Sequence, residues 1–178
     1  MNTDPGDELV DVIDSEGRTI GTVARREIRA RRLPHRCVYI LVFDAAGNLF
    51  VHLRTADKDV YPAHWDVAVG GVLAAGESFD AGARREIREE LGIEAEPERL
   101  FPFRYADAAN FADAWAYRIG HGGPFRLQPE EIVRGEFVPL GEIDARIKRE
   151  AFCPDGVAVL AEYRRRFRSE PSRLPSGP

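Results

Sequence analysis

Cysteine is scarce in this sequence, and long apolar runs are missing from it. Only Cys37 and Cys153 occur, far apart and outside any metal-ligand spacing, so neither a disulfide framework nor a cysteine metal site is indicated. Cys37 lies within the apolar run 37–43 and is expected to be a buried thiol. No run approaches the ~20 apolar residues that span a bilayer, and the acidic start has no apolar core of a secretory signal. We therefore predict a cytoplasmic protein that does not contact membranes.

An excess of positive charge is also absent. The formal net charge of −5 argues against a protein that binds nucleic acid without sequence preference. Basic clusters still occur at 25–26, 29–32 and 164–166, and each of them is either a solvated helix face or the rim of a site for an anionic ligand.

The length of 178 residues, with 44% hydrophobic and 31% charged residues, predicts one domain with its own core. We place this domain at residues 8–168 and expect residues 1–7 and 169–178 to be flexible tails. Hydrophobic alternation and turn residues predict strands at 9–14, 19–23, 37–43, 49–54, 100–105, 111–119 and 132–138, and an extended segment at 65–73 that is broken by Gly70 and Gly71. Helical spacing predicts helices at 25–31, 78–91, 140–149 and 155–167. These elements together favour an α/β fold with a mixed sheet flanked by helices.

The helix predicted at 78–91 carries three carboxylates on one face. At 3.6 residues per turn, Glu86 and Glu90 lie one turn apart with Glu89 beside them, within an arc of about 100°. Like charges at this spacing repel one another. A hard cation would remove the repulsion, and Mg²⁺ prefers carboxylate and phosphate oxygens. These residues are therefore candidate metal ligands, although an acid-rich helix can also be an ordinary solvated surface.

A glycine-containing loop precedes this helix. Gly71 and Gly76 allow the backbone to approach a ligand closely or to lend a carbonyl to the metal. Glu77 and Arg85 can form an ion pair that fixes the loop against the helix. The apolar residues of the helix lie on its other side and can pack in the core: Phe79, Ala83, Ile87 and Leu91.

This segment resembles the signature of the Nudix family. The signature is Gly, five residues, Glu, seven residues, then Arg-Glu-aliphatic-any-Glu-Glu-any-Gly-aliphatic. It is matched at all nine specified positions, namely Gly71, Glu77, Arg85, Glu86, Ile87, Glu89, Glu90, Gly92 and Ile93.

The resemblance implies an α/β/α sandwich and hydrolysis, assisted by a divalent cation, of a diphosphate linked to a nucleoside. It implies Mg²⁺, with Mn²⁺ as a possible substitute, held by Glu86, Glu89 and Glu90 with help from Gly71. Glu86, Glu89 and Arg85 would be the catalytic residues, and the general base is either Glu89 or a glutamate from elsewhere. The partner would be a small-molecule diphosphate, and homodimers are common in the family.

Outside the signature, the chain resembles the Nudix branch that contains isopentenyl-diphosphate isomerase. The resemblance rests on the amino-terminal hairpin, on residues 34–36 and on residues 54–65. It implies that Arg54 and Lys58 bind the diphosphate, which suits two cations near the end of a strand; ordinary surface cations are the alternative.

The isomerase chemistry itself is not expected. Gly70 stands at the position of the catalytic Cys, and Val72 stands at that of a metal-binding His. Ile28 replaces one of the two earlier histidines, His35 matches the other, and the later acidic pair aligns with Ala112 and Ala114. A hydrolase is therefore favoured, and a Nudix-like module that senses a nucleotide without turnover is the alternative.

Some residues have two interpretations. His35 and His64 can be hydrogen-bonded structural residues or ligands. An aromatic set on two neighbouring strands can pack in the core or stack on a flat group of a ligand: Phe103, Tyr105, Phe111, Trp115 and Tyr117.

Overall fold

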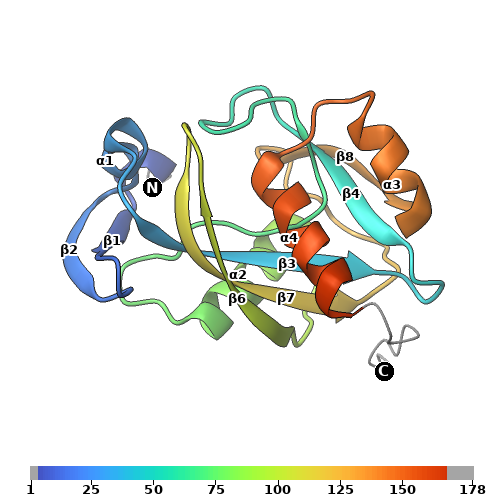
Figure 1. Ribbon diagram of the computed structural model, residues 1–178, viewed down its shortest axis with the longest axis horizontal. Helices are drawn as coiled ribbons and strands as arrows, with labels where there is room; N and C mark the ends of the chain where they lie inside the picture. Colours follow the sequence, from blue (N-terminus) through green and yellow to red (C-terminus); the bar gives the residue numbers. More distant parts are fainter. Residues whose placement is uncertain (1–3, 168–178) are drawn as a thin grey trace.

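The computed structural model describes residues 4–167, and Figure 1 gives the arrangement of their helices and strands. The strands are β1 (Leu9–Ile13), β2 (Thr19–Ala24), β3 (His35–Phe43), β4 (Leu49–Arg54), β5 (Trp65–Asp66), β6 (Glu98–Ala106), β7 (Phe111–Gly120) and β8 (Ile132–Val138). The helices are the 3₁₀ helix η1 (Pro5–Asp7), α1 (Arg25–Arg31), α2 (Phe79–Leu91), α3 (Leu140–Ile147) and α4 (Pro154–Arg166).

The sheet is mixed and has β3 at its centre. One edge of β3 pairs in parallel with β7 along its whole length, and β7 pairs with β6 in an antiparallel hairpin. The amino-terminal hairpin β1–β2 is antiparallel and joins β3 through β1. β4 pairs with β8 and β5 and meets β3 only next to their connecting turn, at Phe43 and Leu49. β3 and β4 therefore diverge from this turn.

Helices cover both faces of the sheet. α2 packs Ala83, Ile87 and Leu91 against one face, together with residues of β3 and β7. The other face is covered by α4, α3 and α1, through side chains such as Val159, Ile143 and Ile28. Figure 1 shows α4 in front of the sheet and α2 behind it. The predicted α/β/α sandwich with a mixed sheet is confirmed.

The segment predicted to be extended at 65–73 is divided between two partner strands. It pairs with β4 only at Trp65 and Asp66, and it then crosses to β3, where Val69 bridges to Ile40 and Val72 to Cys37. The side chain of Asp66 accepts hydrogen bonds from the N–H groups of residues 67 and 68, which replaces strand pairing there. This crossing carries Gly70 and Gly71 past the middle of β3.

Other predictions have mixed outcomes. Cys37 is buried, as expected. Tyr117 belongs to the core and donates a hydrogen bond to Asp80 at 2.6 Å, whereas Arg99 lies over the ring of Trp115, 3.7 Å from its centroid. Residues 169–178 lie outside the described part of the chain, and so do residues 1–3. Within residues 4–167 no helix is long and apolar enough to cross a membrane.

Candidate active site

Local signals fix both ends of α2. The Ser78 hydroxyl accepts a hydrogen bond from the N–H of Ala81 at 3.2 Å, as an N-cap does. Gly92 ends the helix with φ 67°, a conformation that glycine adopts without steric cost. With its apolar side packed on the sheet, the helix turns its acidic side away from the core.

The signature carboxylates line one cleft, of about 410 Å³, on this side of α2. We call it the carboxylate cleft and define it by Glu86, Glu89, Glu90, Glu131 and Lys58. Glu86 and Glu90 are buried, at 7% and 5% exposure, while the Glu89 side chain is 47% exposed. The three acids therefore meet at one place but differ in their access to solvent.

Arg85 organises the acids and the loop before them. Its guanidinium donates to both oxygens of Glu77, each at 2.9 Å, in a bidentate pair. It also donates to Glu86 at 2.9 Å, to Glu89 at 3.0 Å and to the Val72 carbonyl at 3.1 Å. The pairing of Glu77 with Arg85 that spacing suggested is thus present, and it ties the 71–77 loop to two of the three acids.

The charges in the cleft are incompletely balanced. Burial raises the pKa of Glu86 to about 7, although Arg85 beside it opposes the rise. Burial, together with the nearby Glu86 and Glu131, holds the pKa of Glu90 well above its ordinary range. Within residues 4–167, no cation lies within 4.0 Å of the Glu90 carboxylate. A bound cation would stabilise the ionised form of these groups.

Gly71 lies directly against the acids. A Cβ atom at this position would come within 2.6 Å of a Glu86 oxygen, so a larger residue would displace that carboxylate. The Gly71 carbonyl accepts a hydrogen bond from the Val38 N–H at 3.0 Å, which leaves a second lone pair on its oxygen. The donor set of carboxylates and a carbonyl fits a hard divalent cation.

The two predicted diphosphate-binding cations lie in different places. Lys58 lines the carboxylate cleft and forms an ion pair with Glu131. Arg54 ends β4, donates to the Val60 carbonyl at 3.0 Å and lies 4.0 Å from Asp66. It lines a second cavity that adjoins the cleft and shares Arg25, Lys58, Gly70 and Gly71 with it.

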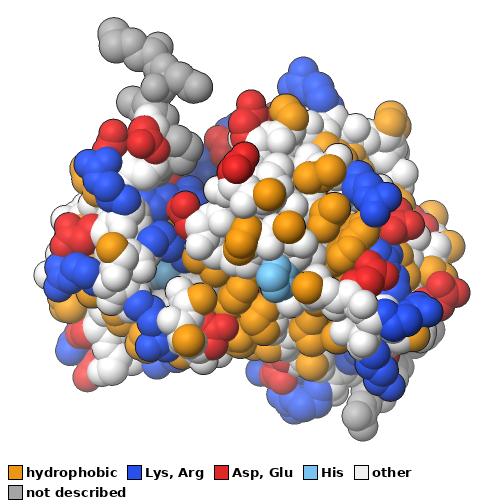
Figure 2. All heavy atoms as spheres, turned by 90° about the horizontal axis from the view of Figure 1, so that it is seen from above, with side chains coloured by type: hydrophobic (Ala, Val, Ile, Leu, Met, Phe, Trp, Pro, Cys, Tyr) orange, Lys and Arg blue, Asp and Glu red, His pale blue; other side chains and the backbone are white. Residues whose placement is uncertain are grey.

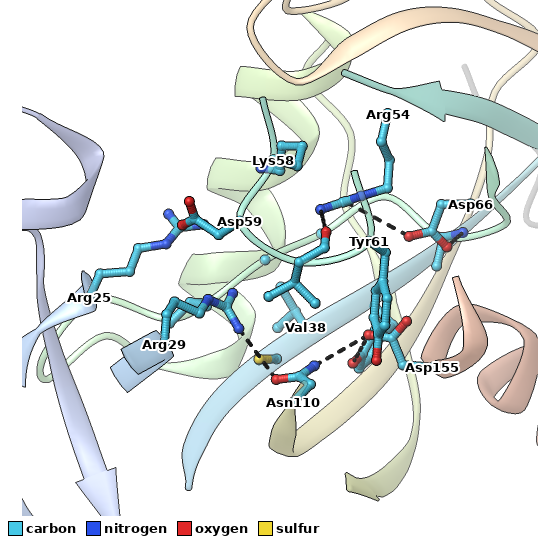
Figure 3. A pocket seen from close by; sticks show the side chains of 17 residues that line it. Arg25, Arg29, Val38, Arg54, Lys58, Asp59, Tyr61, Asp66, Asn110 and Asp155 are labelled. Atoms are coloured by element: carbon cyan, nitrogen blue, oxygen red, sulfur yellow. Dashed lines mark hydrogen bonds and ion pairs between the residues drawn. The ribbon is translucent and has the colours of Figure 1, made fainter. Parts of the chain in front are cut away.

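This second cavity, of about 70 Å³, lies between α1, β3 and the segment that follows β4. We call it the arginine cavity and define it by Arg25, Arg29, Arg54, Tyr61 and Asn110. Figure 3 shows Arg25 and Arg29 reaching in from α1 and Arg54 from the opposite side. In Figure 2, Lys and Arg side chains line a hollow on the side of the molecule that carries α1.

Two aspartates form the inner wall beneath the arginines. Asp155 accepts hydrogen bonds from Tyr39 at 2.9 Å and from Asn110 at 3.4 Å. Asp66, Cys153 and Asp155 lie together and are all buried. Burial and the neighbouring Asp155 raise the pKa of Asp66 to about 7, and the acids of this wall are already engaged with protein donors.

The sequence did not reveal several of these residues. Glu131 sits in the loop before β8, which reaches the cleft only because β8 pairs with β4. Arg29 and Asn110 are 81 positions apart and meet through folding alone. The basic cluster at 29–32 was the only signal, and it favoured a solvated helix face over the rim of a site for an anionic ligand.

The two histidines are bonded to nearby backbone. His35 is buried, its Nδ1 lies 2.8 Å from the Leu33 carbonyl, and burial lowers its pKa to about 4. His64 Nδ1 lies 2.8 Å from the Pro62 carbonyl. No histidine is among the described residues that line the carboxylate cleft or the arginine cavity.

Comparison with known proteins identifies the family of this chain. The NUDIX domain model matches residues 33–158. The Streptomyces coelicolor protein "Uncharacterized Nudix hydrolase SCO1686" is 41% identical over 162 residues, covering 89% of both chains. "Uncharacterized Nudix hydrolase YfcD" of Escherichia coli K12 is 35% identical over 161 residues, covering 89% of this chain and 88% of its own.

Solved structures give the same fold. DR0079 from Deinococcus radiodurans superposes with a TM-score of 0.71 at 28% identity, covering 89% of this chain and 98% of its own. The NUDIX domain of Shewanella oneidensis NrtR, solved with ADP ribose, gives a TM-score of 0.57 at 15% identity, covering 82% and 99%. At this low identity the second likeness concerns the fold alone. The chain belongs to the Nudix family and is a hydrolase that acts on pyrophosphate bonds.

Proposed function

We propose that this protein is a Mg²⁺-dependent hydrolase that cleaves the diphosphate linkage of a nucleoside diphosphate derivative. The observation that carries the proposal is the meeting of Glu86, Glu89 and Glu90 in one cleft, with Arg85 holding two of them. Glu86, Glu89, Glu90 and the Gly71 carbonyl would hold the cation, and Mn²⁺ would serve in its place. When bound, a divalent cation supplies positive charge to diphosphate oxygens and lowers the pKa of water.

The remaining groups bind and orient the substrate. Lys58 faces the carboxylate cleft, where its ammonium can pair with a phosphate oxygen in place of Glu131. Arg54 lines the adjoining cavity and can bind the part of the diphosphate that extends into it. Arg85 keeps Glu86 and Glu89 oriented, while its pair with Glu77 holds the glycine loop in place.

For the general base we favour Glu89. It is the solvent-accessible member of the three acids, so it can take a proton from water that enters the cleft. Glu131 is the second candidate because it lines the same cleft and lies outside the signature. Its ion pair with Lys58 would have to open for this role.

The likeness to the isomerase branch concerns binding and not chemistry. Gly70, at the position of the isomerase Cys, has φ 146°, and a Cβ atom there would lie 2.1 Å from the Val38 carbonyl oxygen. No side chain fits at this position without moving β3. This supports a hydrolase over an isomerase, and the intact set of signature acids supports an enzyme over a sensing module.

The direct test is a hydrolysis screen of the purified protein on a nucleotide panel, in which chromatography separates the phosphomonoester, nucleotide and pyrophosphate products. The panel contains nucleoside triphosphates, nucleotide sugars, ADP-ribose, dinucleotides and prenyl diphosphates, each with Mg²⁺ and with excess EDTA. We expect turnover of at least one nucleotide with Mg²⁺ and none with EDTA. Full activity in EDTA, or turnover of prenyl diphosphates alone, would contradict the proposal.

The proposal also includes a cytoplasmic location and a homodimer. Two free, buried thiols support the first, because they fit a reducing compartment. Cell fractionation tests the location, and light scattering on the eluted protein tests the dimer.

A further inference from the structure

Arg29 is a largely buried cation without an anionic partner. One of its Nη atoms donates a long hydrogen bond, 3.3 Å, to the side-chain amide oxygen (Oδ1) of Asn110, and its Nε is buried without any hydrogen bond. Within residues 4–167 no carboxylate lies within 4.0 Å of its guanidinium. Burial is the main cause that lowers the pKa of Arg29, so the fold places this charge where it is poorly solvated.

Arg54, on the opposite wall of the arginine cavity, repeats this pattern at its Nε alone, because it also forms an ion pair with Asp66. Its Nε is also buried without a hydrogen bond, and its nearest carboxylate, on Asp66, is 4.0 Å away. Figure 3 shows the two guanidinium groups on opposite sides of the cavity. Two unsatisfied donors from separate elements therefore flank one small space.

The acids of the cavity compensate these two cations only in part. Burial lowers the pKa of Arg54, but Asp66 and other nearby anions outweigh this effect and raise it, whereas Arg29 has no carboxylate within 4.0 Å among residues 4–167. Asp155 is engaged by Tyr39 and Asn110, and Asp66 accepts bonds from its own backbone neighbours. Asp59 is exposed and forms no ion pair with Arg29 among the described residues. Burying an unpaired charge lowers the stability of the fold. Proteins keep such a charge at sites where a ligand of opposite charge binds to it.

We propose that the arginine cavity is a second anion subsite, in which Arg29 and Arg54 bind a terminal phosphate of the substrate. The proposal rests on the proposed function, since the cavity opens into the cleft where the diphosphate would lie. The fork of donors on a guanidinium matches phosphate oxygens. A volume of about 70 Å³ suits a phosphate group and is too small for a nucleoside. The preferred substrates therefore carry a free terminal phosphate beyond the cleaved linkage.

Calorimetric titration of the metal-free protein with inorganic phosphate and with pyrophosphate tests the subsite without catalysis. We expect Arg29→Gln to weaken binding about tenfold or more, as the loss of a charged hydrogen-bond partner does. Arg29→Lys, which keeps the charge but not the fork, should be intermediate. Arg31→Gln is the matched control, because Arg31 lies on the same helix, is exposed and pairs with Glu27. Equal phosphate affinity of wild type and Arg29→Gln would overturn the proposal.

Thermal unfolding separates binding from a structural role. In phosphate-free buffer Arg29→Gln should be at least as stable as wild type, because it removes an uncompensated charge. Added phosphate should then stabilise wild type and not the variant. A variant that loses stability in phosphate-free buffer, yet is stabilised by phosphate like wild type, would contradict the proposal.

Kinetics distinguishes a substrate phosphate from free phosphate. For Arg29→Gln, kcat/KM should fall about tenfold on a nucleoside triphosphate and change little on ADP-ribose, which has no terminal phosphate. An equal fall on both substrates would refute the terminal-phosphate assignment. If wild type hydrolyses no nucleotide of the panel but binds phosphate through Arg29, the proposed function fails and the anion subsite stands.

Discussion

The carboxylate cleft and the arginine cavity lie side by side and share four lining residues, yet they are built in different ways. Three acids of the cleft come from five consecutive residues of one helix, and one arginine orients two of them. The cavity takes its side chains from α1, β4, the loop after β4 and the turn before β7. Carboxylates line the cleft and suit a cation, whereas arginines line the adjoining cavity and suit an anion. Together they form a surface suited to a polyanion bridged by a metal.

The largest effect should come from removing one charge from the cleft. Glu90→Gln or Glu89→Gln should lower kcat about 100-fold or more while the protein stays folded, because each change removes a carboxylate that would serve the cation. Glu94→Gln, on the exposed residue after the helix, is the matched control and should keep wild-type turnover. Near-normal turnover in both cleft variants would place the metal elsewhere.

The next effect concerns the arginine that orients the acids. Arg85→Lys cannot hold both Glu77 oxygens and two further acids, since an ammonium lacks the planar fork. Turnover should fall about tenfold, and Tm should fall by roughly 2–4 °C for each kcal/mol lost. Arg84→Lys changes an exposed neighbour that pairs with Glu96. If the two variants behave alike, Arg85 has no orienting role.

A smaller and uniform effect is expected from the diphosphate-binding cations. Lys58→Ala should lower kcat/KM by a similar factor on every substrate, roughly tenfold, because the diphosphate is common to all of them. Arg54→Ala should also lower kcat/KM on every substrate. The decrease should be larger for substrates that occupy the arginine cavity. The measurement uses at least three substrates that share only the diphosphate. A change in one substrate alone would refute the assignment of Lys58.

The smallest effect is on stability and comes from the acidic wall of the cavity. The pKa of Asp66 is raised from 3.8 to about 7 in the fold, so the folded protein holds a proton that the unfolded chain releases. This contribution to stability is complete below about pH 4 and is lost as pH rises through about 7. Asp66→Asn keeps the acceptor oxygen for the backbone and removes the titration.

The Tm of Asp66→Asn minus that of wild type should therefore increase between pH 5 and pH 8. Asp57→Asn, an exposed aspartate of the neighbouring loop, should show a constant difference. A difference for Asp66→Asn that does not change with pH would show that this carboxyl is already ionised in the fold.

The two regions also mark what the sequence could predict. The acids of α2 were readable because a helix converts a spacing of three or four residues into one face. The helix ends, Ser78 and Gly92, and the pairing of Glu77 with Arg85 depend on near neighbours and were equally accessible. A mixed sheet flanked by helices followed from strands and helices with clear periodicity, and the resemblance to the Nudix family implied the α/β/α sandwich.

The arginine cavity was not readable, because its contacts join distant parts of the chain. Arg29 meets Asn110 81 residues away, Tyr39 meets Asp155 116 residues away, and Lys58 meets Glu131 73 residues away. The change of partner strand within the 65–73 segment, from β4 to β3, has a similar origin. It depends on a competition between β4 and β3 for pairing, which no local pattern encodes.

The central claim is that Glu86, Glu89 and Glu90 hold a divalent cation. Its most direct test is Mn²⁺ binding followed by electron paramagnetic resonance, on wild type, Glu90→Gln and the Glu94→Gln control, without substrate. We expect saturable binding to wild type and to Glu94→Gln, and affinity at least about tenfold weaker in Glu90→Gln. Equal Mn²⁺ affinity of Glu90→Gln and wild type would contradict the claim.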